Sequence, residues 1–266
     1  MVDLNRCQRH VERAVQAAHG ILLEGFRSRP RATLKSSEID FVTEYDRRSE
    51  IVIKEALAPL GLAIVGEESG GTPADYTFFV DPLDGTTNYL HGHPFFAISI
   101  GLCAADVPVL GVVHAPALGV TWSAIRGRGA TRNQELCRVT DTARLEDALL
   151  ATGFPYDRRE SDADNLYEFI RLKKVTRGVR RCGSAAIDVC MVADGTYDGY
   201  WEMKLNPWDW AAATCILHEA GGTSSRYDGS AFDVREPREG LRRTELVASN
   251  GHVHAAILAE LNDTSE

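Results

Sequence analysis

Four short strand patterns between residues 77 and 125 constrain the fold of this chain more than any other feature. Each segment is rich in β-branched or aromatic residues, and Gly, Asp or Pro residues separate the segments. They cover residues 77–80, 95–102, 109–114 and 120–125. Closely spaced strands joined by short turns pair in the antiparallel sense. The sequence therefore predicts a largely antiparallel sheet in the first half of the chain.

Two helical patterns precede these strands. Over residues 4–26, apolar side chains recur at three- and four-residue spacing, which is the periodicity of one helix face. A second helix is expected from Thr43 to about residue 60, because Thr43 is a suitable cap and the acids Glu44 and Asp46 fall in the first turn. Helices beside an antiparallel sheet predict an N-terminal α+β lobe, which we assign to residues 1–145.

Strands and helices alternate after residue 140. Strand patterns cover residues 149–151, 197–203 and 246–248. Helical patterns cover residues 162–173, 184–193, 207–220 and 253–261. Such alternation is typical of α/β architecture, so we expect an α/β C-terminal lobe over residues 146–266.

The composition excludes several functional classes. Of the 266 residues, 44% are apolar, which is ordinary for a globular protein and excludes disorder of the whole chain. The 29 basic and 38 acidic residues give a net charge of −9, which argues against nucleic-acid binding through bulk positive charge. No apolar run reaches the roughly 20 residues of a membrane span, and the charged N-terminus does not resemble a signal peptide. Six cysteines without a CxxC pair indicate reduced thiols, so we expect a cytoplasmic protein without membrane or nucleic-acid partners.

The segment Asp81-Pro82-Leu83-Asp84-Gly85-Thr86-Thr87-Asn88 carries the strongest chemical signal. Two carboxylates three residues apart leave a strand end on a tight turn, which Pro82 restricts and at which Gly85 permits close approach of a ligand. Mg²⁺ prefers a few carboxylate oxygens together with water and substrate phosphate. The carbonyl of Leu83 offers a further oxygen. The segment therefore predicts a magnesium site.

Two other acidic motifs flank this segment in the sequence. Gly66-Glu67-Glu68-Ser69 follows an apolar stretch, and Asn206-Pro207-Trp208-Asp209-Trp210 opens a predicted helix. Each motif alone has an ordinary structural explanation, as solvated loop acids or as an acid in the first turn of a helix. The Trp and Ala neighbours of Asp209 would bury its carboxylate, and a buried charge needs a partner.

Together the three motifs resemble the inositol monophosphatase family in order and approximate spacing. The resemblance extends over nearly the whole chain and includes Lys35-Ser36-Ser37, Asp46, Gly183-Ser184-Ala185-Ala186 and Tyr200-Trp201-Glu202-Met203. Ala213 stands where the family usually has glycine, which removes no metal ligand. The resemblance implies a layered αβαβα sandwich with the site between the lobes, a homodimer, two or three Mg²⁺ ions and inhibition by lithium.

It also implies roles for individual residues. The implied magnesium ligands are Glu67, Asp81, the Leu83 carbonyl, Asp84 and Asp209, with Glu68 as a water-mediated ligand of a third ion. Thr86 and Asp46 resemble the pair that orients and deprotonates the attacking water, and Glu67 and Asp209 belong to the catalytic set. The backbone of Gly85 and Thr86 would hold the phosphate group. Ala185 and Glu202 would contact the hydroxyls of the sugar. Asp209 would lie near the departing alcohol.

The sequence thus predicts a magnesium-dependent phosphomonoesterase that hydrolyses a small polyol or sugar phosphate by in-line attack of a metal-activated water. The family resemblance makes myo-inositol monophosphate the expected substrate, and Tyr200-Trp201-Glu202 favours a polyol because the carboxylate of Glu202 can accept hydrogen bonds from vicinal hydroxyls. Fructose 1,6-bisphosphate, histidinol phosphate and a 3′-phosphonucleotide remain alternatives, as does a regulatory protein-binding role. The basic run Arg177-Gly178-Val179-Arg180-Arg181 is interpreted as a solvated face or as a recruiter of anionic substrate. The eight histidines form no zinc motif.

Overall fold

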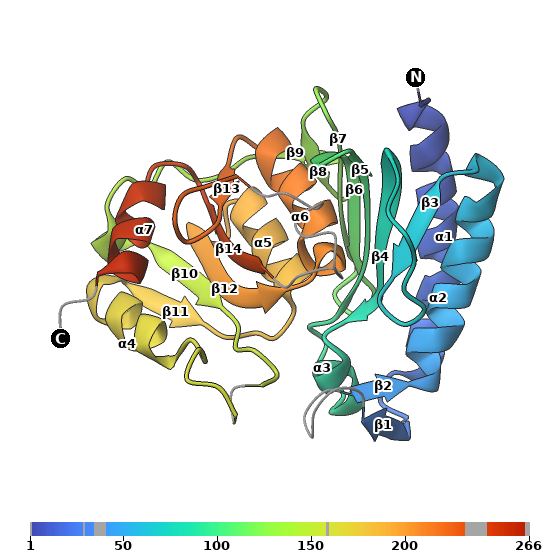
Figure 1. Cartoon of the computed structure of the whole chain (residues 1–266), viewed down its shortest axis with the longest axis horizontal. Helices are drawn as coiled ribbons and strands as arrows, with labels where there is room; N and C mark the ends of the chain where they lie inside the picture. Colours follow the sequence, from blue (N-terminus) through green and yellow to red (C-terminus); the bar gives the residue numbers. More distant parts are fainter. Residues whose placement is uncertain (1, 29, 35–40, 158–159, 232–243, 264–266) are drawn as a thin grey trace.

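A computed structural model describes residues 2–28, 30–34, 41–157, 160–231 and 244–263. Its helices and sheets form five layers (Figure 1). An outer helix pair covers a seven-stranded sheet, a central helix pair follows, and a five-stranded sheet is covered by a last helix pair. The three pairs are α1 (Leu4–Gly25) with α2 (Glu44–Leu57), α5 (Ala185–Ala193) with α6 (Pro207–Glu219), and α4 (Leu166–Val175) with α7 (His254–Asn262). The expected αβαβα sandwich is confirmed. The Lys35–Ser37 motif lies outside the described residues.

The seven-stranded sheet contains all four predicted strands. Its order is β3 (Ala63–Gly66), β4 (Tyr76–Asp84), β5 (Ala97–Ala104), β6 (Val107–Ala115), β7 (Val120–Ile125), β8 (Ala130–Arg132) and β9 (Glu135–Cys137). Every pairing is antiparallel except β3 with β4, which is parallel. Two further strands, β1 (Ala32–Leu34) and β2 (Phe41–Thr43), form a separate antiparallel pair before α2. The predicted antiparallel sheet is therefore confirmed, with a parallel edge strand added.

The five-stranded sheet belongs to the second half of the chain. Its order is β11 (Gly178–Arg180), β10 (Leu149–Thr152), β12 (Gly199–Leu205), β14 (Thr244–Ser249) and β13 (Thr223–Ser225). β10 runs parallel to β11 and β12, whereas the remaining pairs are antiparallel. Most of the basic run at 177–181 therefore forms an edge strand.

The helix predicted over residues 162–173 begins four residues later, at Leu166. Asn165 causes this shift, because its backbone is left-handed (φ 70°) and its side chain is fully buried. Its amide nitrogen donates to the carbonyl of Gly153 (2.5 Å), and its oxygen accepts a bond from the indole of Trp201 (2.8 Å). The helix predicted from Thr43 to about residue 60 also differs at one end. Its α-helical part, α2, ends at Leu57, and a 3-10 turn, η1 (Ala58–Leu60), follows.

Helix α6 lies between the two sheets and is buried along most of its length. It packs directly on the seven-stranded sheet, since a Cβ atom at Gly101 of β5 would lie 2.6 Å from the amide nitrogen of Ala212. Ala213, which replaces the usual family glycine, is fully buried in the same core. This close packing fixes the start of α6 beside the end of β4, where the acidic motifs meet. None of the described helices is long and apolar enough to cross a membrane.

Candidate active site

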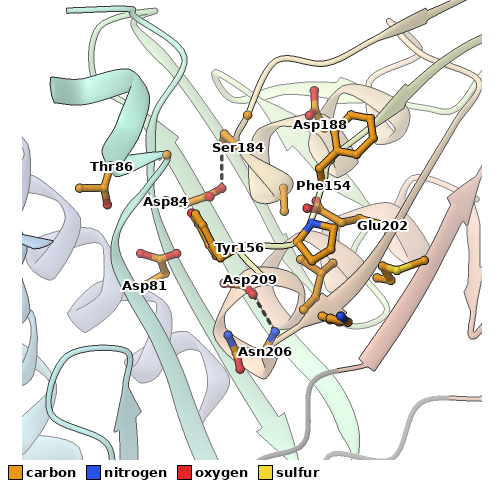
Figure 2. Close-up of a pocket in the computed structure, with 18 of the residues that line it drawn as sticks. Asp81, Asp84, Thr86, Phe154, Tyr156, Ser184, Asp188, Glu202, Asn206 and Asp209 are labelled. Carbon is orange, nitrogen blue, oxygen red and sulfur yellow. Dashed lines mark hydrogen bonds between the residues drawn. The ribbon is translucent and has the colours of Figure 1, made fainter. Parts of the chain in front are cut away.

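The three acidic motifs meet at one pocket of about 110 Å³ between the two sheets. Nine of the predicted site residues line it, namely Glu67, Asp81, Leu83, Asp84, Gly85, Thr86, Ala185, Glu202 and Asp209. Asp46 and Glu68 are not among the lining residues, but the carboxylate of Asp46 lies beside the hydroxyl of Thr86, which does line the pocket. Figure 2 shows Asp81, Asp84 and Asp209 around the same hollow, with Glu202 on the side opposite Asp81.

A bulge in β4 brings Asp81 and Asp84 to the pocket. In a regular strand, residues three apart point to opposite faces. Here Asp81 pairs with Ser99 and Asp84 with Ala97, so β4 contains one more residue than β5 between these pairs. The extra residue reverses the alternation, and both carboxylates line the pocket. The amide of Leu83 donates to Oδ1 of Asp81 (2.9 Å), which holds the bulge in this shape.

Asp84 joins the two halves of the chain. Its Oδ2 accepts hydrogen bonds from the hydroxyl of Ser184 (2.6 Å) and the amide of Ala186 (2.8 Å) at the start of α5. Gly85 follows with φ 91°, and a Cβ atom there would lie only 3.0 Å from the carbonyl of Phe95. The glycine is therefore required both by the backbone conformation and by the close approach of neighbouring backbone.

The expected pairing of Thr86 with Asp46 is present. The hydroxyl of Thr86 lies 3.1 Å from Oδ1 of Asp46 and 3.1 Å from the carbonyl of Leu83, and can donate to either. Asp46 is fully buried, and its Oδ2 accepts from the amide (2.8 Å) and hydroxyl (2.5 Å) of Thr43 in the capping box of α2. The cap that starts the helix thus also fixes the carboxylate that faces Thr86.

Glu67 is held in place from α2. The carboxylate of Glu50, which is 3% exposed, accepts a bond from the amide of Glu68 (2.8 Å) and another from the hydroxyl of Ser69. It also fills the space that a side chain at Gly66 would need. Glu50 therefore fixes the turn that presents Glu67, a role that the sequence did not suggest.

Asp209 occupies the first turn of α6, as predicted. Its Oδ2 accepts from the amide of Asn206 (2.7 Å), and Figure 2 shows this bond at the pocket floor. The hydroxyl of Ser99 on β5 donates to the carbonyl of Trp208 (3.1 Å), which fastens this turn to the sheet that carries Asp81. The capping geometry and the sheet contact together determine where the carboxylate points.

The pocket concentrates negative charge. Six of its described lining residues are acidic and two, Arg181 and Lys204, are basic. Burial, and after it the neighbouring Glu67, raises the pKa of both Asp81 and Asp209 well above the usual range. Burial also raises the pKa of Asp84 to about 6, although the bonds from Ser184 and Ala186 oppose the shift. Carboxylates crowded in this way favour a bound cation.

The donor set fits magnesium. Carboxylate and carbonyl oxygens are the ligands that Mg²⁺ prefers, and Glu67, Asp81, Leu83, Asp84 and Asp209 supply only such atoms. Among the described residues, no three His, Cys, Asp or Glu side chains are already gathered tightly enough to enclose an ion. The candidate ligands thus share one pocket, while several of their oxygens accept hydrogen bonds from the protein.

Asp188 is a pocket residue that the sequence reading missed. It is 1% exposed, and its Oδ1 has no hydrogen-bond partner among the described residues. Burial, followed by the charge of Glu202, raises the pKa of this carboxyl well above the usual range. Asp188 lies one helical turn after Ser184 on α5, so the spacing of the two polar residues was the available signal.

Comparison with known proteins decides the family. The family described as "Inositol monophosphatase family" matches residues 3–266. The chain belongs to the inositol monophosphatase family. It is therefore a phosphatase that hydrolyses phosphate monoesters, in a family that depends on metal ions, typically Mg²⁺.

Relatives within the inositol monophosphatase family differ in their names. An inositol-1-monophosphatase of Synechocystis sp. is 42% identical over 85% of this chain and 78% of its own length. Nus factor SuhB of Pseudomonas aeruginosa is 40% identical over 84% of this chain and 83% of its own length. The solved structure of inositol monophosphatase from Anabaena superposes with a TM-score of 0.86, at 37% identity over 97% of this chain and 96% of that one.

Proposed function

We propose that this phosphatase hydrolyses the monophosphate of a small polyol, with myo-inositol monophosphate as the preferred substrate. The observation that carries the proposal is that one pocket holds the acidic residues Asp81, Asp84 and Asp209 together with Glu202. The first three suit a cation-bound phosphate, and Glu202 suits the hydroxyls of the alcohol to which the phosphate is attached.

Two or three Mg²⁺ ions are proposed as cofactors. Glu67, Asp81, the Leu83 carbonyl, Asp84 and Asp209 would hold them, with Glu68 as an outer ligand through water. When bound, Mg²⁺ offsets the charge of the phosphate, lowers the pKa of a coordinated water and stabilises the leaving alkoxide.

The chain's own groups would orient the reaction. The hydroxyl of Thr86 lies within hydrogen-bond reach of Asp46, whose other oxygen is committed to Thr43. Oδ1 of Asp46 would accept the proton that Thr86 passes on as its hydroxyl takes one from the attacking water. The amides of Gly85 and Thr86 would donate to the phosphate oxygens.

Recognition of the alcohol is assigned to the side of the pocket formed by the second half of the chain. Glu202 would accept bonds from two hydroxyls, Ala185 would contact the ring, and Asp209 would lie beside the departing oxygen. The hydroxyl of Tyr200 donates to Oε2 of Glu202 and limits its rotation. A fixed carboxylate costs less entropy on binding than a mobile one.

Two alternatives rest on specific observations. Arg181 lines the pocket and could pair with a second anionic group of the substrate. Such a contact would favour fructose 1,6-bisphosphate or a 3′-phosphonucleotide over an inositol monophosphate. Histidinol phosphate is a further candidate within the family. The likeness to a protein named a Nus factor supports a regulatory protein-binding role. Homodimer formation and a cytoplasmic location belong to this proposal as well.

A substrate panel tests the proposal. Phosphate release is measured from myo-inositol 1-phosphate, fructose 1,6-bisphosphate, histidinol phosphate and phosphoadenosine phosphate, each with and without Mg²⁺. We expect the largest kcat/KM on the inositol phosphate, only with Mg²⁺. Preference for another substrate would refute the substrate assignment, and turnover of none of them together with capture of transcription proteins would favour the regulatory role.

A further inference from the structure

Lys204 has an unusual backbone in the strand that forms one wall of the active site. Its φ is 62°, in the left-handed region that favours glycine. It lies in a bulge of β12, since Glu202 pairs with Leu246 and Leu205 with Thr244. A non-glycine residue keeps such a conformation only where the surroundings hold it. The side chain of Lys204 shows what those surroundings are.

The ammonium group of Lys204 is bound to the segment that follows β10. It donates to Oδ1 (2.9 Å) and Oδ2 (2.8 Å) of Asp157 and to the hydroxyl of Ser161 (3.0 Å). The side chains of Lys204 and Asp157 are 22% and 37% exposed, so the ion pair is partly shielded from water. A lysine whose charge is used in this way is engaged with the protein rather than with a substrate phosphate.

The segment from Gly153 to Asp157 runs along the pocket between two anchors on β12. At its start, Gly153 lies so close to the carboxylate of Glu202 that no Cβ atom would fit between them. At its end, Asp157 is bound to Lys204. Between the anchors, Phe154, Pro155 and Tyr156 line the pocket, and Figure 2 shows Phe154 and Tyr156 among the acidic residues.

We propose that Lys204 is a positioning residue for substrate recognition, and that its salt bridge to Asp157 holds residues 153–157 across the alcohol-binding side of the pocket. We call this pair the Lys204–Asp157 clamp. The inference rests on the proposed polyol phosphatase function and deepens it. The clamp keeps Pro155 and Tyr156 against a bound polyol, while the carboxylates around the phosphate do not depend on it. Its loss weakens polyol binding and leaves the chemical step nearly unchanged.

Kinetics of K204M, D157N and the double variant test the clamp. With myo-inositol 1-phosphate, we expect KM to rise about fivefold in each single variant, with kcat changed less than twofold. With p-nitrophenyl phosphate, which has no hydroxyls to recognise, KM should change less than twofold. The double variant should be no worse than either single one, because both remove the same interaction. K204R keeps the positive charge, so its KM for myo-inositol 1-phosphate should stay close to that of the unchanged protein. K173M, at an exposed lysine of α4, is the control and should leave both KM and kcat unchanged.

Hydrogen exchange of the substrate-free protein separates this inference from the proposed function. In K204M and D157N, the backbone amides of Phe154, Tyr156 and Asp157 should exchange about fivefold faster than in the unchanged protein, whereas those of α6 should not change. Faster exchange without polyol phosphatase activity would overturn the proposed function and keep the clamp. Unchanged exchange and an unchanged KM in K204M, or effects of K204M and D157N that add in the double variant, would overturn the clamp.

Discussion

Replacement of Glu202 by Gln should lower the selectivity of the enzyme for polyol phosphates over an aryl phosphate. It should also abolish the pH dependence of this selectivity. Burial raises the pKa of Glu202 to about 7, although the hydrogen bond from Tyr200 opposes the shift. The carboxyl is therefore protonated below about pH 7 and ionised above it. Only the ionised form can accept hydrogen bonds from two substrate hydroxyls with both oxygens.

The magnitude follows from this pKa. With a pKa of about 7, the ionised fraction rises from roughly one tenth at pH 6 to roughly nine tenths at pH 8. Selectivity that depends on the carboxylate should therefore rise about tenfold over this range. A hydrogen bond to a charged group contributes about 1.5–3 kcal/mol, so Glu202→Gln or Glu202→Ala should lower the selectivity at pH 8 by roughly 10- to 150-fold.

The assay compares kcat/KM for myo-inositol 1-phosphate with kcat/KM for p-nitrophenyl phosphate at pH 6, 7 and 8 and saturating Mg²⁺. The ratio of the two should rise with pH in the unchanged enzyme and stay flat in Glu202→Gln. Tyr200→Phe removes the donor to Oε2, so the pKa of Glu202 should increase and the rise of the ratio should move to higher pH. Equal losses on both substrates, or the same pH dependence in Glu202→Gln, would refute the assigned role.

Three other predictions concern the metal site, lithium and stability. Asp84→Asn should reduce turnover roughly 10³-fold while leaving the far-ultraviolet circular dichroism spectrum unchanged, and a variant that keeps half of the original turnover would contradict its assignment as a ligand. Li⁺ should inhibit more deeply as substrate rises, because it would trap the product complex, whereas Na⁺ at equal ionic strength should not; identical inhibition curves would indicate only a general salt effect. Burial, and after it the nearby His19, lowers the pKa of His114 to about 4, so its contribution to stability is complete above about pH 6.5 and is lost as the pH falls toward 4. Denaturant titrations should show a loss of about 1–2 kcal/mol over this range, allowing for partial exposure, and a smaller loss in His114→Gln.

The sequence predicted the parts of the fold that depend on local patterns. The amphipathic period of α1 and the β-branched runs of β5 to β7 depend on spacing alone, and all are present. The start of α4 was predicted too early, because the left-handed backbone of Asn165 depends on its hydrogen bonds to Gly153 and Trp201, which are distant from it in sequence. A periodicity of apolar residues contains no record of such contacts.

The residues of the candidate site also fall into two groups, those that sequence motifs predicted and those that only the structure reveals. Asp81, Asp84 and Asp209 were found because each lies in a motif of consecutive residues, and the structure brings all three to one pocket. Asp188 and Lys204 were missed because neither lies in such a motif. Asp188 reaches the pocket through the orientation of α5, and the importance of Lys204 becomes visible only through its backbone conformation and its salt bridge to Asp157.

Dependence of phosphate release on Mg²⁺ tests the central claim most directly. The unchanged protein is freed of metal with a chelator, and release of phosphate from myo-inositol 1-phosphate is followed as MgCl₂ is added back. A pocket whose carboxylates serve to hold Mg²⁺ predicts no release above background without metal, and saturable recovery as Mg²⁺ is restored. Full activity of the metal-free protein, at a level that added Mg²⁺ does not change, would contradict the assignment of this pocket as a magnesium-dependent phosphatase site.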